Sequence, residues 1–170
     1  MKRFGLISLL LLLIAGCASS EQVSTKNFSP QDIMFAEMMI PHHEQAVEMA
    51  ELAFENTTNS DVLALAEQIS GAQEPEIEQM KSWPGVDATG HAGHTMAGML
   101  DAKEMEKLRN STGEEFDRLF LEGMIKHHEG AIDMAEMISD STNSEVANLG
   151  KSIIASQRAE IEAMRALLDK

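Results

Sequence analysis

The sequence predicts an all-α fold: a four-helix bundle built from a duplicated helical hairpin, with a short extra helix in the connection. The first observation is that "MIPHHEQAVEMAE", Met39 to Glu51, recurs 85 residues later as "MIKHHEGAIDMAE". The second is that "QEPEIEQM", from Gln73, recurs 84 residues later as "QRAEIEAM", from Gln157. Two matching segments in the same order indicate two copies of one hairpin, with one residue gained or lost near a turn.

The chain begins with a bacterial export signal, in which Lys2 and Arg3 precede an apolar run that ends at Ile14. This run is too short to be a permanent membrane helix. The following "IAGC" resembles a lipobox, so Cys17 is expected to carry a lipid. The alternative is an ordinary signal peptide cleaved near Ala18.

Three segments are therefore expected: a lipoprotein signal peptide at residues 1–16, a flexible polar tether at 17–28, and a helical domain at 29–170. Cys17 is the only cysteine. Disulfides and thiolate metal sites are excluded for the rest of the chain, although an exported protein could form disulfides.

Two long helices are expected first. One begins at "SPQD", where Ser29 can cap the helix and proline fits its first position, and it ends near Asn56. The next begins after Asn59 and ends at "WPG", residues 83–85. Proline inside each helix, at 41 and 75, is expected to bend it, because proline removes a backbone hydrogen bond.

The second half of the domain repeats this arrangement after a connection. Residues 84–100 are expected to form a loop rich in Met and His, and "DAKEMEKLR" from Asp101 a short amphipathic helix that ends near "NSTG". Two further helices are expected at Glu114 to about Ser139 and at Glu145 to about Leu168. The repeats then cover about 31–83 and 114–168.

The composition favours cations over nucleic acid as partners. There are 13 Lys and Arg against 28 Asp and Glu, a formal net charge of -15. Such a chain repels nucleic acid and attracts cations, although an acidic surface that only keeps the protein soluble is the alternative. The chain also contains 13 methionines, an unusual supply of thioether groups.

The paired histidines are expected on helix faces that point into the bundle. At about 100° per residue, His42 shares a face with Phe35 and Met49, and His43 lies about a quarter turn away. The second copy repeats the pattern, and methionines lie one turn before the second histidine and two turns after the first in each copy. The candidate metal ligands of the helices are His42, His43, His127, His128, Met39, Met49, Met124 and Met134.

The alternative for these residues is packing. Histidines of the core could bond to Gln73, Glu76, Gln157 or Glu160, and methionines at helical spacing often only fill a core. Four imidazoles at related positions are costly to bury unpaired, so their duplication favours metal ligation. The four Gln and Glu residues could themselves be ligands or could orient the imidazoles, and structural bonding is their expected role.

A second candidate site lies in the loop, where "HAGHTMAGM" supplies His91, His94, Met96 and Met99. Imidazole and thioether together suit copper, and thioether favours Cu(I). These methionines have no obvious core to fill. The alternative is a disordered connector of small residues.

The motifs "HHEQAVEMA", "TMAGML", "GEEFDRLFLEGMIKHHEGAIDMAE" and "QRAEIEAM", in this order, resemble the bacterial family of domain of unknown function 305 over essentially Phe28 to Leu168. The resemblance implies an exported, ferritin-like bundle, and some members of the family are periplasmic copper-binding proteins linked to copper tolerance. The family's paired histidines fall on the four listed above, and its Met-rich loop on Met96 and Met99. Gly123 occupies the position that corresponds to Met38, so the two copies are not equivalent.

Three functions are compared. The first is an exported lipoprotein, anchored to the cell envelope and facing the periplasm or the exterior, that buffers or delivers copper, favoured as Cu(I), or silver. The second is a ferritin-like redox or iron protein, which should carry Glu-x-x-His; Met39, Ile40, Met124 and Ile125 occupy that position instead. The third is a structural or partner-binding bundle with packing histidines. The sequence favours the first, without enzymatic activity and with no protein partner identified.

Overall fold

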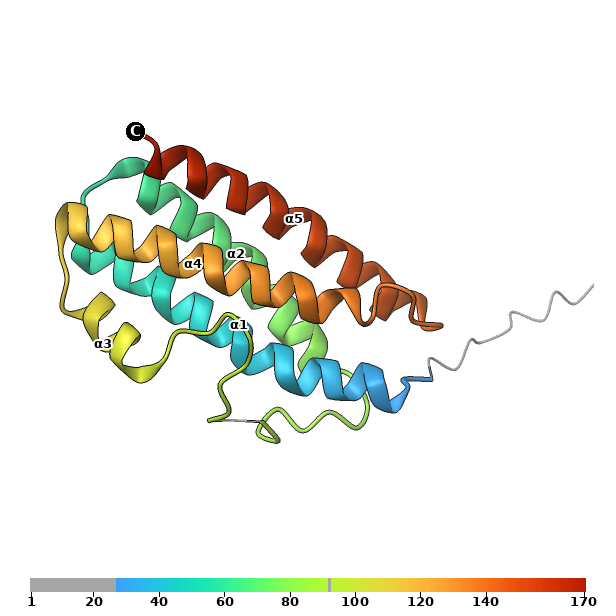
Figure 1. Cartoon of the computed structure of the whole chain (residues 1–170). Coiled ribbons are helices and arrows are strands. Elements are labelled where there is room, and N and C mark those ends of the chain that lie inside the picture. The colour runs from blue at the N-terminus through green and yellow to red at the C-terminus, as the bar shows by residue number, and fades with distance from the viewer. Residues whose placement is uncertain (1–26, 92) are drawn as a thin grey trace, which may run out of the picture.

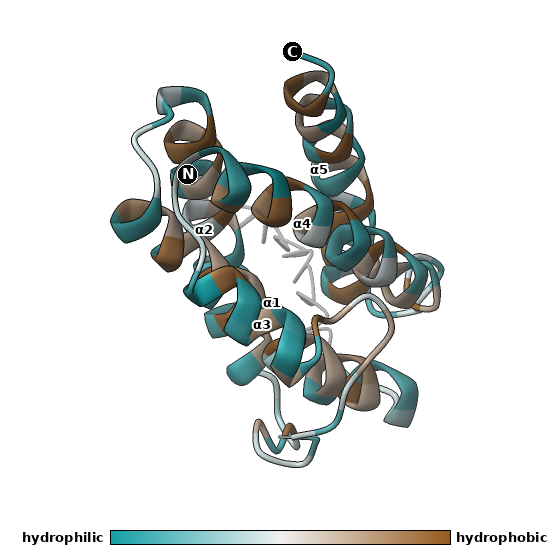
Figure 2. Cartoon of the chain, turned by 60° about the vertical axis from the view of Figure 1, so that its left-hand side comes forward, coloured by the Kyte–Doolittle hydropathy of each residue, from teal (hydrophilic) through white to brown (hydrophobic). Residues whose placement is uncertain are grey.

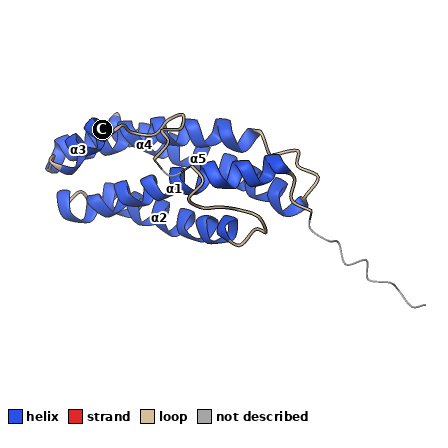
Figure 3. Cartoon of the chain, turned by 90° about the horizontal axis from the view of Figure 1, so that it is seen from below, coloured by secondary structure: helices blue, strands red, loops and turns tan. Residues whose placement is uncertain are grey.

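The computed structural model describes residues 27–91 and 93–170. Over these residues the chain forms five helices and no strand: α1 (Pro30–Asn56), α2 (Ser60–Lys81), α3 (Ala102–Arg109), α4 (Gly113–Glu136) and α5 (Ser144–Leu168) (Figures 1 and 3). The predicted all-α class is confirmed. The expected signal peptide, the lipidation at Cys17 and most of the tether lie outside the described residues.

Local capping explains why the helices begin where they do. Ser29 accepts a hydrogen bond from the backbone of Asp32, whose carboxylate accepts from the backbone of Ser29 in return. Asn59 and Asn143 cap α2 and α5 in the same chain positions of the two hairpins, and Asp101 caps α3. Each cap satisfies backbone N–H groups that a helix start leaves unpaired.

The four long helices lie lengthwise beside one another, and α3 covers one end of α1 and α4 (Figure 1). The helix α1 packs against α2, α4 packs against α5, and α1 packs against α4. The start of α1 meets the end of α4, because Gln31 Nε2 donates to the Met137 carbonyl at 2.7 Å and Ser141 Oγ donates to Asp32 Oδ1 at 2.9 Å. The helices α1 and α4 are therefore antiparallel.

The buried side chains form two hydrophobic clusters. The first core cluster contains Met49, Met124 and Phe120, and the second core cluster contains Met39 and Met134. Figure 2 shows that each long helix carries both hydrophobic and hydrophilic residues, as an amphipathic helix must to bury one face. Each cluster thus receives one candidate methionine from each repeat, which follows from the antiparallel arrangement of α1 and α4.

No helix of the described residues is both long enough and apolar enough to cross a membrane.

Candidate metal site

Four histidines meet in the interior where α1 and α4 pack together, and all four are fully buried. The rings of His42 and His127 are closest, with centroids 3.8 Å apart and planes inclined by 40°. His43 and His128 lie outside this pair, with ring centroids 6.5 Å from His42 and 6.3 Å from His127 respectively. The structure therefore brings both predicted histidine pairs into one cluster.

Backbone carbonyls hold the two inner histidines. His42 Nε2 donates to the Ala97 carbonyl at 3.1 Å, and His127 Nε2 donates to the carbonyl of His42 itself at 2.9 Å. A carbonyl oxygen can only accept a hydrogen bond, so the proton of each neutral ring is on Nε2.

Carboxylates hold the two outer histidines. His43 Nε2 lies 2.8 Å from Glu76 Oε2 on α2, and His128 Nε2 lies 2.7 Å from Glu160 Oε2 on α5. An ionised carboxylate also only accepts, so these rings also carry a proton on Nε2. Gln68 Nε2 donates to the second oxygen of Glu160 at 3.0 Å. The structural bonding expected of Glu76 and Glu160 is present.

The Nδ1 atoms of all four histidines are buried and have no hydrogen-bond partner. Because the proton is on Nε2, each Nδ1 presents a lone pair, which is what a metal ion requires of an imidazole. The side-chain amides of Gln73 and Gln157, one helical turn before the two glutamates, are also buried and unpaired. Buried polar atoms are rarely left unpaired, so this donor set fits a bound metal ion.

The electrostatic environment keeps the inner rings neutral. Burial lowers the pKa of His42 to about 3, and the adjacent His43 lowers it further, against the opposing hydrogen bond from Ala97. Burial also lowers the pKa of His127 well below its usual value, helped by His42 and His128. Neutral imidazole is the form that ligates metal, so protons compete little for these two nitrogens near neutral pH.

The four helical methionines are buried in the two core clusters, on either side of the histidines. No group of three or more His, Cys, Asp or Glu side chains is arranged to hold a metal ion in the part of the chain that the structure describes. A site in the helices must therefore add a thioether or an amide to imidazole. The one-turn pairs Met39 with His43 and Met124 with His128 offer this combination.

The loop residues are brought together in pairs. His91 Nδ1 lies 3.3 Å from His94 Nδ1, and the backbone N–H of Met96 donates to Met99 Sδ at 3.3 Å. His91 Nε2 also lies 3.9 Å from a carboxylate oxygen of Glu37. Met96 packs against the second core cluster, so the expectation that the loop methionines have no core to fill is wrong for this residue. His94 and Met99 line one surface hollow of about 380 Å³.

The end of this loop, residues 96–100, forms a strap that lies across α1 and α4. Gln45 on α1 holds Leu100 through both its backbone N–H, at 2.8 Å, and its carbonyl, at 3.0 Å. Gly130 on α4 admits the strap, because any Cβ there would overlap the carbonyl of Ala97. Sequence reasoning missed this link between the loop and His42. Its signal was Gly130, which takes the place of Gln45 in the second copy.

The expected difference between the copies has a steric cause at Gly123. A Cβ at this position would lie 3.2 Å from the Leu100 side chain and 3.3 Å from Met49 Cε. The glycine therefore leaves space for a strap residue and for one of the candidate methionines.

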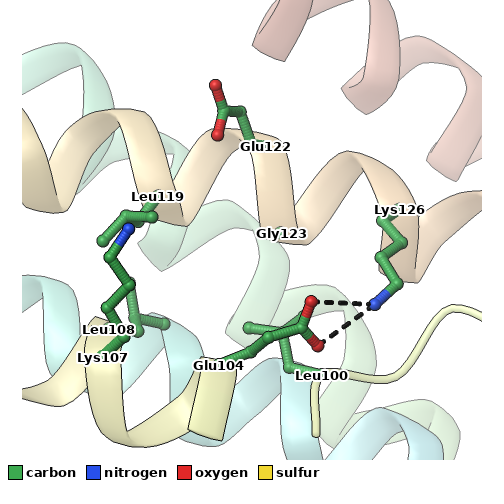
Figure 4. A pocket seen from close by; sticks show the side chains of 8 residues that line it. All are labelled: Leu100, Glu104, Lys107, Leu108, Leu119, Glu122, Gly123 and Lys126. Atoms are coloured by element: carbon green, nitrogen blue, oxygen red, sulfur yellow. Dashed lines mark hydrogen bonds and ion pairs between the residues drawn. The ribbon is translucent and has the colours of Figure 1, made fainter.

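Another hollow, of about 290 Å³, lies between α3 and α4 (Figure 4). Its polar lining consists of two lysines and two glutamates, and Figure 4 shows Lys126 paired with Glu104, at 3.1 Å. It contains no histidine and no methionine. The hollow therefore does not extend the candidate site.

Comparisons with known proteins were made against this geometry. Residues 32–168 match the family described as Domain of unknown function (DUF305). A DUF305 fragment from Deinococcus radiodurans is 31% identical, with a TM-score of 0.74 over 83% of this chain and 97% of that chain. A DUF305 protein from Streptomyces coelicolor that is described as secreted is 31% identical, with a TM-score of 0.74 over 82% and 92%.

CopM, solved in a Cu(II)-bound form, is 36% identical, with a TM-score of 0.69 over 80% of this chain and 94% of that chain. CopM has also been solved in Cu(I)-bound and Ag-bound forms. No curated protein matches the sequence.

Proposed function

The chain belongs to the DUF305 family, and we propose that it is an exported protein that binds copper or silver ions through histidine and methionine. The similarity to CopM, which has been solved with Cu(II), Cu(I) and Ag, supports these metals. The similarity to a protein described as secreted supports export. Its role would be metal buffering, tolerance or delivery, without enzymatic activity.

We further propose a ferritin-like four-helix bundle formed by two copies of one hairpin, with a lipid on Cys17 that holds it at the cell envelope. The recurring histidine motifs and the matching caps Asn59 and Asn143 support the duplication. The single cysteine in "IAGC" supports the anchor.

The observation that carries the metal proposal is the division of work within each imidazole. Nε2 of every histidine in the cluster is used in a hydrogen bond, while Nδ1 is buried with its lone pair unpaired. Leaving a buried acceptor unpaired costs about 1–3 kcal/mol, and a soft cation bound at Nδ1 would remove that cost. Methionines buried on both sides make the surroundings suitable for Cu(I) or Ag(I).

The test replaces His42 and His127 together by glutamine. Glutamine carries an NH2 donor at the end of a side chain of similar reach, so it can keep the bonds to the carbonyls of Ala97 and residue 42 while it removes both Nδ1 ligands. We expect metal-free stability to change little and Cu(I) and Ag(I) binding to fall sharply. Competition titrations on protein without a polyhistidine tag measure the binding, with Mg(II) and Fe(II) as hard-metal controls.

A matched variant separates the helical site from the loop. Replacing His91, His94, Met96 and Met99 by Ala or Leu removes the loop ligands and leaves the helical cluster intact. We expect the helical ions to remain bound in this variant. Full stoichiometry and full affinity in the glutamine variant would instead show that His42 and His127 are packing residues.

A further inference from the structure

The two outer histidine–glutamate pairs differ in their access to solvent. His43 and His128 are both fully buried, but the side chain of Glu76 is 16% exposed and that of Glu160 only 4%. The carboxylate of Glu76 therefore contacts a buried imidazole through one oxygen and still reaches the surface. Its counterpart Glu160 does not.

One residue accounts for the difference. Gln68 on α2 donates to Glu160 Oε1 at 3.0 Å and covers that carboxylate. The repeat offset of 84 residues places Ser152 of α5 at the position of Gln68. The offset holds in the packing, because Leu65 and its counterpart Leu149 are buried to the same extent. Serine is too short to cover Glu76 as the glutamine covers Glu160.

A hollow of about 410 Å³ lies between α2 and α5 at this position. It is lined by Glu76, Gln79, Glu145, Asn148, Leu149 and Ser152. Two of these residues are carboxylates and none is Lys or Arg, so the hollow concentrates cations. Glu76 joins the floor of the hollow to His43, because its Oε2 atom lies 2.8 Å from His43 Nε2.

We propose that this hollow is the route by which a soft metal cation enters and leaves the buried histidine cluster, with Glu76 as the first ligand that the ion meets. Ser152 keeps the route open, and Gln68 closes the equivalent position in the other copy. This proposal rests on the proposed metal binding. It makes the His43 side the exchanging side of the protein and the His128 side the retaining one.

The test is a pair of reciprocal substitutions in the full chain, purified in detergent without a polyhistidine tag. Ser152→Gln should close the hollow and slow Ag(I) uptake and release by about tenfold, the lower end of what a focusing charged cleft contributes to association rates. Gln68→Ser should open the second route and speed exchange. The double variant should regain a rate close to that of the unaltered protein. The number of ions bound at equilibrium should not change in any variant.

Trp83 offers a built-in probe of the route. It is the only tryptophan, and its Nε1 donates to Glu145 Oε1, at the lining of the hollow, at 3.2 Å. Stopped-flow fluorescence after mixing with Ag(I), followed by chase with a thiol chelator, measures uptake and release. Circular dichroism of each variant checks the fold, and Ser152→Asn provides a smaller side chain if Ser152→Gln is unfolded.

The outcomes separate the two proposals. Normal stoichiometry with unchanged rates in both single variants would overturn the entry route and leave the metal site intact. Reduced stoichiometry at an unchanged rate in Ser152→Gln would also overturn it, because the hollow would then be a binding site and not a passage. Failure of the unaltered protein to bind Ag(I) or Cu(I) would overturn the proposed function itself.

Discussion

Gly130→Ala tests whether the strap is held against α4 and whether it supports His42. Alanine is favoured over glycine inside a helix by about 1 kcal/mol, so helix propensity alone predicts stabilisation. The added Cβ would overlap the Ala97 carbonyl, a backbone group that cannot rotate away. The strap must therefore move, and the Ala97 carbonyl is the acceptor for His42 Nε2.

The magnitude follows from these terms. Overpacking of this kind costs about 1–3 kcal/mol, and leaving the buried His42 donor unpaired costs about 1–3 kcal/mol more. After the helix-propensity gain is subtracted, we expect a net loss of about 3 kcal/mol in the free energy of unfolding. This is a large effect for the addition of one methyl group.

Gly71→Ala is the matched control. Gly71 lies exposed inside α2, and a Cβ there would have no heavy atom within 4 Å. The same substitution should therefore stabilise the protein by about 1 kcal/mol. Urea unfolding followed by far-UV circular dichroism measures both changes as shifts of the midpoint at constant slope. Equal stabilisation by the two substitutions would refute the contact between the strap and α4.

Three further predictions concern pH, the start of the domain and the anchor. Because the pKa of His42 falls from 6.5 to about 3 on folding, its stabilising effect is complete above pH 6.5 and is lost toward pH 3. Urea midpoints at pH 7 and pH 5 should show a loss of about 1.4 kcal/mol per pH unit, and less in His42→Gln. Asp32→Ala removes half of a capping box and the bond from Ser141, so calorimetry should show a loss of about 1–3 kcal/mol; an unchanged melting temperature would contradict this. Cys17→Ser should abolish acylation by mass spectrometry, and finding unacylated wild-type protein would contradict the expected anchor.

Helix starts could be predicted from the sequence more accurately than one of the helix ends. The start of α1 after Ser29 depends on a cap and a proline at adjacent positions, which are local signals. The predicted end of the third long helix at Ser139 is wrong by three residues, because α4 ends at Glu136 and the chain continues in turns. Gln31 reaches the Met137 carbonyl there from 106 residues away. Sequence periodicity carries no signal for such a contact.

The candidate site was predictable to the same extent. Helical periodicity placed His42 and His127 on inward faces, and both are fully buried. The acceptor of His42 is a loop carbonyl 55 residues away, which depends on how the strap packs and not on any local pattern. The unequal exposure of Glu76 and Glu160 could have been inferred from the repeat alone, since Gln68 and Ser152 differ at one offset.

Packing and metal ligation are compatible roles for these histidines, because they use different atoms of the same ring. The hydrogen bonds at Nε2 fix the tautomer and the orientation of each ring before any ion arrives. A site that is already ordered spends little of its binding free energy on rearrangement, so the metal-free fold favours tight binding. Metal should then stabilise the folded chain by binding alone, by about 2.7 kcal/mol when free metal is 100 times the dissociation constant. A shift in melting temperature that saturates with free Ag(I) would not fit this linkage, because the stabilisation must keep rising with the logarithm of the free concentration.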